Sequence, residues 1–274
     1  MRKALACLAV VAGLAASGAA HAGATLDRVT SKGVLVMSTD PKYPPQSSLN
    51  ADNQFEGFDI DVGTEIAKRL GVKIQFVTPD WDVITAGKWS GRWDMSVGSM
   101  TVTPARAKVL DFPAIYYYTP AGLAVHKDNT TIKDATDAAG KRIGVGTATT
   151  YEDYLRGTLA LGSDATPIKS VIKDPVIKTY ESDGLTIDDL KLGDGARLDA
   201  VMTAVPTIDA AIKSGIPIKL VGKPLYYEAL AVATDRGDPE FDAKLAAIVD
   251  AMHKDGTLTK FSMKWYGRDL TVSE

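Results

Sequence analysis

The sequence has a single cysteine, Cys7, and its position excludes disulfide chemistry from nearly all of the chain. Cys7 lies in an amino-terminal segment with a basic start, an apolar run over residues 4–16 and the small-residue pattern Ala20-His21-Ala22. This three-part layout predicts a secretory signal peptide, residues 1–22, that is cleaved after Ala22. Because the thiol leaves with that segment, we expect neither disulfides nor thiolate metal ligands in the exported chain. A lipid anchor is not expected, since it would need a cysteine at the cleavage point.

Long apolar runs, blocks of like charge and histidines are also scarce. After residue 22 no stretch reaches the roughly 20 apolar residues that cross a bilayer, so we expect a soluble product in the periplasm. Loss of Arg2 and Lys3, two positive charges, changes the formal net charge from −3 to −5. An acidic exported protein is a poor candidate for nucleic-acid binding. Only His126 and His253 follow the leader, and neither lies near a second ligand, so no metal or cofactor is predicted.

Short apolar runs alternate with helix-like segments along the rest of the chain, which predicts an α/β fold with a largely parallel sheet. A helix is expected from Gly57, with Asp59 or Asp61 as its cap and Gly71 at its end. Residues 159–192 show no clear period. The expected strands are residues 33–37, 73–77, 94–97, 122–125, 142–145, 197–202, 217–221 and 230–233, and further helices are expected over residues 83–89, 132–138, 207–214 and 241–253 and from residue 149.

A run of hydroxyl groups and an arginine follows the apolar residues 94–97. Ser99, Thr101 and Thr103 occupy alternate positions. Pro104 has the fixed φ of a first helical turn, and Arg106 falls inside that turn. A planar five-donor guanidinium beside hydroxyls and a helix start suits a carboxylate, which accepts two parallel hydrogen bonds. We therefore predict a binding site for a small carboxylate-bearing molecule, rather than a surface arginine at a helix end.

Seven segments occur in the order and spacing of one family, and together they cover nearly the whole exported chain. The chain resembles the periplasmic solute-binding proteins of polar amino-acid ABC transporters, bacterial solute-binding protein family 3. The segments are residues 40–45, Gly57-Phe58-Asp59-Ile60-Asp61, Trp81-Asp82, residues 98–106, residues 140–145, residues 197–201 and the terminal segment from Asp255-Gly256 to Trp265-Tyr266-Gly267.

The resemblance implies a two-lobed α/β fold, the type II periplasmic-binding-protein fold, with two hinge crossovers. Lobe 1 would comprise residues 23–121 plus 229–274, and lobe 2 residues 122–228. Such proteins close around a ligand by a hinge motion and then present one surface to an ABC permease in the inner membrane. A shuttle of this kind needs no partner subunit, so a monomer is expected.

The resemblance also implies roles for individual residues in the cleft. Arg106 would hold the ligand's α-carboxylate, and Ser99 and Thr101 would assist with hydroxyl and backbone groups. A second contact to the same carboxylate would come from the other lobe, where free N–H groups at a helix start favour an anion. The remaining predicted site residues are Asp40 in the cleft lining, Tyr43 and Trp81 as aromatic walls, and Thr149 and Thr150 as the opposing carboxylate contact.

One position departs from the family pattern. Family members commonly have an aspartate, five residues after the position of Asp199, that pairs with the ligand's α-ammonium; here Ala204 stands there. Burying an ammonium without a carboxylate costs several kcal/mol. Either another acid supplies the charge or the ligand lacks a free α-amine. The candidate acids are Asp40, Glu152, Asp183 and Glu228.

These observations predict a non-enzymatic periplasmic protein that delivers a small carboxylate-bearing solute, a polar amino acid, to an ABC importer. The alternative is a cyclohexadienyl (prephenate/arogenate) dehydratase-like enzyme on the same fold, which would use cleft acids as proton donors. The alanine at residue 204 keeps this alternative open, because an enzyme could have lost the ammonium contact. No Gly-x-Ser-x-Gly motif favours a hydrolase.

Overall fold

The fold is seen in a computed structural model that describes residues 24–162 and 165–273. The predicted signal peptide and its cleavage point, with Cys7, lie outside the described residues. Within the described part of the chain, no helix combines the length and apolar character that a membrane crossing requires.

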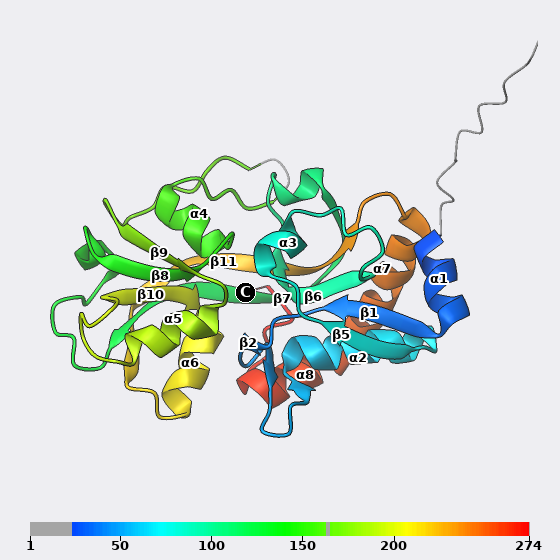
Figure 1. Ribbon diagram of the computed structural model, residues 1–274, viewed down its shortest axis with the longest axis horizontal. Helices are drawn as coiled ribbons and strands as arrows, with labels where there is room; N and C mark the ends of the chain where they lie inside the picture. The colour runs from blue at the N-terminus through cyan, green and yellow to red at the C-terminus, as the bar shows by residue number, and fades with distance from the viewer. Residues whose placement is uncertain (1–23, 163–164, 274) are drawn as a thin grey trace, which may run out of the picture.

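One eight-stranded sheet runs through the whole molecule (Figure 1). Its strands are β1 Val34–Ser38, β5 Lys73–Val77, β6 Met95–Thr101, β7 Leu110–His126, β8 Arg142–Gly146, β9 Val176–Tyr180, β10 Ala200–Ala204 and β11 Ile218–Asp235. In space they follow the order β5-β1-β6-β11-β7-β10-β8-β9. Pairing is parallel at each end and antiparallel around β7 and β11 in the middle. The sheet is therefore mixed, and the prediction of a largely parallel sheet holds only for its two ends.

Strands β7 and β11 are the two hinge crossovers. They contain 17 and 18 residues and pair antiparallel from Ile218 with His126 to Asp235 with Leu110. The sequence predicted only three short strands in these regions. A strand that leaves one core and enters another has no single buried pattern along its length, so its middle is not recognisable from periodicity. The predicted two-lobed α/β fold with two crossovers is confirmed.

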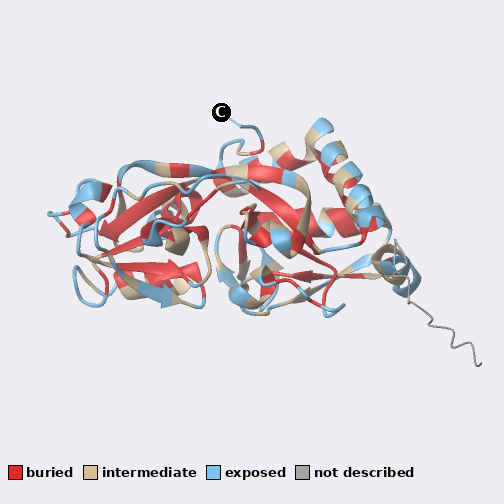
Figure 2. Ribbon diagram, turned by 90° about the horizontal axis from the view of Figure 1, so that it is seen from above, coloured by how far each residue is buried: buried red, intermediate tan, exposed pale blue. Residues whose placement is uncertain are grey.

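Helices cover both faces of the sheet at each end. They are α1 Ala24–Lys32, α2 Phe58–Leu70, α3 Trp81–Thr85, α4 Thr150–Arg156, α5 Asp183–Leu190, α6 Val205–Lys213, α7 Pro239–Lys254 and α8 Thr257–Tyr266. Strand β10 is buried on both faces: Met202 packs towards α4 on one face, and Val201 packs towards α5 and α6 on the other. Figure 2 shows buried residues along the central strands and exposed residues on the outer helical surfaces.

Separate hydrophobic cores define two lobes. The first lobe surrounds β1, β5 and β6, and the second lobe surrounds β8, β9 and β10. Along β7 the core changes between Tyr117 and Ala121, and along β11 it changes between Tyr226 and Leu230. The predicted limits, residues 23–121 plus 229–274 and residues 122–228, stay a prediction, which these changes of core support.

The predicted start of α2 at Gly57 is confirmed, but its predicted cap and the predicted helix after Pro104 are wrong. Helix α2 begins after Gly57 without a side-chain cap, because Asp59 turns into the first lobe and Asp61 bonds to Trp265 at 2.7 Å. Its predicted end is confirmed, since Gly71 has the left-handed φ of 74°. After Pro104 there is only the 3₁₀ turn η1 Arg106–Lys108, because the chain enters β7 two residues later.

A small second sheet lies at the contact between the lobes. It consists of β2 Lys42–Tyr43, β3 Ser47–Leu49 and β4 Phe55–Glu56. Strand β2 occupies the two residues between Pro41 and Pro44. Strand β2 packs against α5 of the second lobe and so brings Tyr43 to the gap between the lobes.

Candidate ligand-binding site

A cavity between the two lobes brings all eight predicted site residues together. They come from separate elements of both lobes: the loop after β1, strand β2, the start of α3, strand β6, turn η1 and the start of α4. The predicted residues in the lining are Asp40, Tyr43, Trp81, Ser99, Thr101, Arg106, Thr149 and Thr150. Their binding roles stay predictions, and the contacts below describe what each side chain does in the structure.

The Arg106 guanidinium is buried in this cavity, and the side chain is only 6% exposed. Its Nη1 donates to the Thr101 carbonyl at 2.9 Å, and its Nη2 donates to the Ala148 carbonyl of the second lobe, also at 2.9 Å. The group lies 5.4 Å from the centre of the Trp81 ring. It forms no ion pair with a carboxylate of residues 24–162 or 165–273. Desolvation lowers the pKa of Arg106, and the negative charge of Glu228 opposes this shift.

The Ala148 carbonyl, which accepts from Arg106, also accepts from Trp81 of the first lobe. Ala148 has a φ of 58° and directs its carbonyl to both Arg106 Nη2 and Trp81 Nε1, the latter at 3.3 Å. On the other wall, the Tyr43 hydroxyl lies 3.4 Å from the Tyr151 hydroxyl of the second lobe. Both predicted walls therefore contact the second lobe directly.

Glu228 is a buried acid at the centre of the cavity, and it was only one of four candidates in the sequence. Its Oε1 accepts hydrogen bonds from Thr101 of the first lobe at 2.6 Å and Thr150 of the second lobe at 2.5 Å. Desolvation raises the pKa of Glu228, while these hydroxyls and the Arg106 charge oppose the rise. Glu228 thus links both lobes and balances part of the arginine charge.

Thr149 acts as the cap of α4. Its Oγ1 accepts from the Glu152 N–H at 3.3 Å and donates to the Gly146 carbonyl at 2.7 Å. Glu152 accepts from the Ala148 N–H at 2.8 Å and pairs with Arg156. Some of the N–H groups at the start of α4 are therefore hydrogen-bonded within the chain. Glu152 does not line the cavity.

A buried acid, Asp59, accepts a hydrogen bond from Ser99 and fixes its position. Ser99 has a φ of 56°, its N–H donates to the Tyr116 hydroxyl, and its own hydroxyl donates to Asp59 at 2.8 Å. Asp59 also accepts from Tyr116 at 2.7 Å. Burial raises the pKa of Asp59 to about 7. Ser99, a predicted binding residue, is thus fixed by a carboxyl group inside the first lobe.

We predict that Asp59→Asn alters the pH dependence of stability. A carboxyl whose pKa is raised on folding stabilises the fold fully below its unfolded pKa and loses that contribution as pH rises through the folded pKa. Between pH 4 and pH 7 the wild type should therefore lose up to about 4 kcal/mol relative to Asp59→Asn. Denaturant unfolding at several pH values measures this difference, and parallel stability profiles would contradict it.

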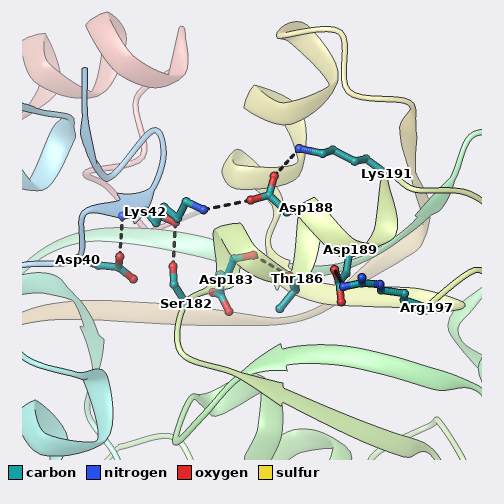
Figure 3. Close-up of polar contacts among 9 residues, drawn as sticks. All are labelled: Asp40, Lys42, Ser182, Asp183, Thr186, Asp188, Asp189, Lys191 and Arg197. Carbon is teal, nitrogen blue, oxygen red and sulfur yellow. Dashed lines mark hydrogen bonds and ion pairs between the residues drawn. The ribbon is translucent and has the colours of Figure 1, made fainter. Parts of the chain in front are cut away.

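The outer rim of the cleft joins the lobes through β2 and α5 (Figure 3). The Lys42 carbonyl accepts from the Ser182 hydroxyl at 2.8 Å, and Lys42 Nζ lies 3.2 Å from Asp188. Asp40 accepts from the Lys42 N–H at 2.7 Å. Asp188 of α5 thus contacts the first lobe.

Several cavity residues were not among the predicted site residues: Tyr151, Glu181, Ser182 and Asp183, with Asp183 considered only as a candidate acid. Three of them lie in residues 159–192, where the sequence has no clear period. The described residues contain no cluster of three or more His, Cys, Asp or Glu side chains that could hold a metal ion.

Two α/β lobes joined by two hinge strands, with a cavity lined by residues of both lobes, form the architecture of a two-lobed binding protein. The chain belongs to the bacterial extracellular solute-binding proteins, family 3, which match residues 35–268. This is a family of binding proteins and not of enzymes.

Known proteins of this class are similar over nearly the whole chain. The L-cystine-binding protein TcyJ of Escherichia coli (strain K12) is 30% identical over 266 residues, covering 96% of this chain and 94% of TcyJ. The crystal structure of the ancestral amino acid-binding protein AncCDT-1, a precursor of cyclohexadienyl dehydratase, is 31% identical with a TM-score of 0.77, covering 88% and 99% of the two chains. An ancestral arginine-binding protein bound to arginine is 32% identical with a TM-score of 0.74, covering 86% and 99%.

Proposed function

We propose that this protein is a periplasmic binding protein that captures an amino acid by its α-carboxylate and delivers it to an ABC permease of the inner membrane. The observation that carries the proposal is the buried Arg106 guanidinium in the cavity between the lobes. Two of its five N–H donors bond to backbone carbonyls, and no described carboxylate pairs with it. A ligand carboxylate would supply the missing negative charge in a planar, bidentate contact.

The same geometry links binding to closure. Arg106 belongs to the first lobe, yet it also bonds to Ala148 of the second lobe. A ligand that is held from both lobes favours the closed state over the open state by the difference between its affinities for the two. The closed protein then offers the permease a surface made of both lobes. A monomer suffices for this cycle.

The names of similar proteins support an amino acid as the ligand. TcyJ is named for L-cystine, and the solved ancestral proteins are described as binding arginine and glutamine. The predicted signal peptide supports a periplasmic location. These names do not favour the dehydratase alternative, since AncCDT-1 is itself described as amino acid-binding.

A melting-temperature screen tests the proposal. The exported chain is mixed with the common amino acids, small organic acids and neutral sugars. A true ligand at 100 times its Kd stabilises the fold by about 2.7 kcal/mol, which for a chain of this size raises Tm by about 5–10 °C. Shifts by sugars alone, with none from any carboxylate, would refute carboxylate recognition. Formation of an aromatic product from prephenate or arogenate would refute the non-enzymatic assignment.

A further inference from the structure

A carboxylate from a different element lies beside the end of β10, the strand whose last residue is an aspartate in the family pattern. Ala204 ends β10 and is buried, and its methyl group offers no charge. The preceding residue, Thr203, donates its hydroxyl to Asp183 Oδ2 at 2.9 Å. Asp183 is the first residue of α5, so this helix brings its acid to the end of the neighbouring strand.

The Asp183 carboxylate is held in one orientation at the cavity wall. Its Oδ1 accepts from the Gly146 N–H at 2.9 Å, and the side chain belongs to a residue that is only 6% exposed. A Cβ atom at residue 146 would lie 2.7 Å from that oxygen, so the close approach requires glycine. A carboxylate oxygen can accept a second hydrogen bond. Both oxygens of Asp183 therefore keep capacity for a donor from a ligand.

The other candidate acids are engaged differently. Glu152 bonds to the Ala148 N–H and to an arginine, and it does not line the cavity. Glu228 accepts two threonine hydroxyls from opposite lobes and is the acid that most strongly offsets the Arg106 charge. Asp40 belongs to the outer rim and accepts from a backbone N–H of its own loop. In Figure 3, Ser182 lies between Asp40 and Asp183.

The surroundings of Asp183 favour a cation. Burial, together with the nearby acids Asp40 and Glu228, raises the pKa of Asp183 to about 7 against the hydrogen bonds from Thr203 and Gly146. A positively charged group beside the carboxylate would stabilise its ionised form and offset the desolvation free energy.

We infer that Asp183 is the partner of the ligand's ammonium group and replaces the aspartate that is absent at residue 204. With Arg106 for the carboxylate and Asp183 for the ammonium, the cavity selects α-amino acids over carboxylic acids without an amine. This inference rests on the proposed function and names the substrate class of the same site.

The test compares each amino acid with its deaminated analogue in calorimetric titrations. The pairs are L-cystine with dithiodipropionic acid, L-arginine with delta-guanidinovaleric acid, and L-glutamine with glutaramic acid. For the pair that binds, the wild type should prefer the amino acid by at least about 100-fold, since the deaminated analogue leaves the buried Asp183 carboxylate without a positively charged partner. Asp183→Asn, which keeps the shape of the side chain, should reduce this preference to less than about tenfold.

Two further variants separate a lost charge partner from damage to the fold. Glu152→Gln removes a candidate acid that lies outside the cavity and should keep the wild-type preference. Asp183→Asn combined with Ala204→Asp returns a carboxylate to the end of β10 and should restore the preference at least in part. A fold defect would weaken both members of a pair equally, and it would not be rescued by an acid at residue 204.

The outcomes distinguish this inference from the proposed function. If Asp183→Asn prefers the amino acid as strongly as the wild type does, Asp183 is not the ammonium partner, and the proposed function still stands. The inference is also overturned if the wild type binds both members of a pair equally. If no member of any pair binds to the wild type and the amino-acid screen is negative, the proposed function fails as well.

Discussion

Arg106→Ala should abolish the ligand-induced rise in melting temperature and weaken ligand binding by about 1,000-fold. The guanidinium is buried beside Trp81 and bonds to both lobes. Removing one partner of a buried charge pair costs about 3–5 kcal/mol, because the remaining ligand carboxylate is desolvated without compensation. The substitution also removes the positive charge that partly balances Glu228. Calorimetric titration and thermal melts with the ligand from the screen measure this loss.

Arg92→Ala is a matched control for that experiment. Arg92 also lies over a tryptophan, 4.8 Å from the centre of the Trp93 ring, but it is exposed on the surface. Its removal should leave ligand affinity within about twofold of the wild type, since exposed charges contribute little. Arg106→Lys keeps the charge and loses the planar fork, so its affinity should fall between those of Arg106→Ala and the wild type. Wild-type binding by Arg106→Ala would show that the carboxylate is held elsewhere.

The cavity residues could be predicted because their sequence signals are local. Arg106 follows a strand and a run of hydroxyls, whereas Tyr43 was indicated only by the resemblance. The resemblance then supplied the pairing between segments that are far apart in the sequence. All of these residues line one cavity, although their roles in binding are still untested.

The rest of the site depends on contacts that no local pattern encodes. Asp183 lies within a stretch without clear periodicity, and its contacts with Thr203 and Gly146 form only in the folded lobe. Asp59 looks like a helix cap in the sequence, yet it faces Tyr116 and Ser99 because helix α2 buries its first turn. Strands β7 and β11 were fragmented in the prediction, since each passes between two cores.

Gly184→Ala should prevent full closure of the lobes without weakening the second lobe itself. A Cβ atom at residue 184 would overlap the carbonyl oxygen of Lys42 in the first lobe, and a backbone atom cannot rotate away. Alanine is also a better helix former than glycine by up to about 1 kcal/mol, so α5 should not be destabilised. The ligand-free protein should therefore melt at or above the wild-type temperature.

Ligand binding should weaken by at least about 100-fold in this variant, because contacts from both lobes can form together only in the closed state. Small-angle X-ray scattering should show the wild type becoming more compact on addition of ligand, whereas Gly184→Ala should stay extended. Asp188→Ala is the matched control on the same helix: it removes an ion pair whose side chains are 55% and 39% exposed. Such a pair contributes at most about 1 kcal/mol, so binding should change by less than about fivefold. If Gly184→Ala binds and compacts like the wild type, the contact between β2 and α5 is not required for closure, and ligand affinity depends on the cavity residues alone.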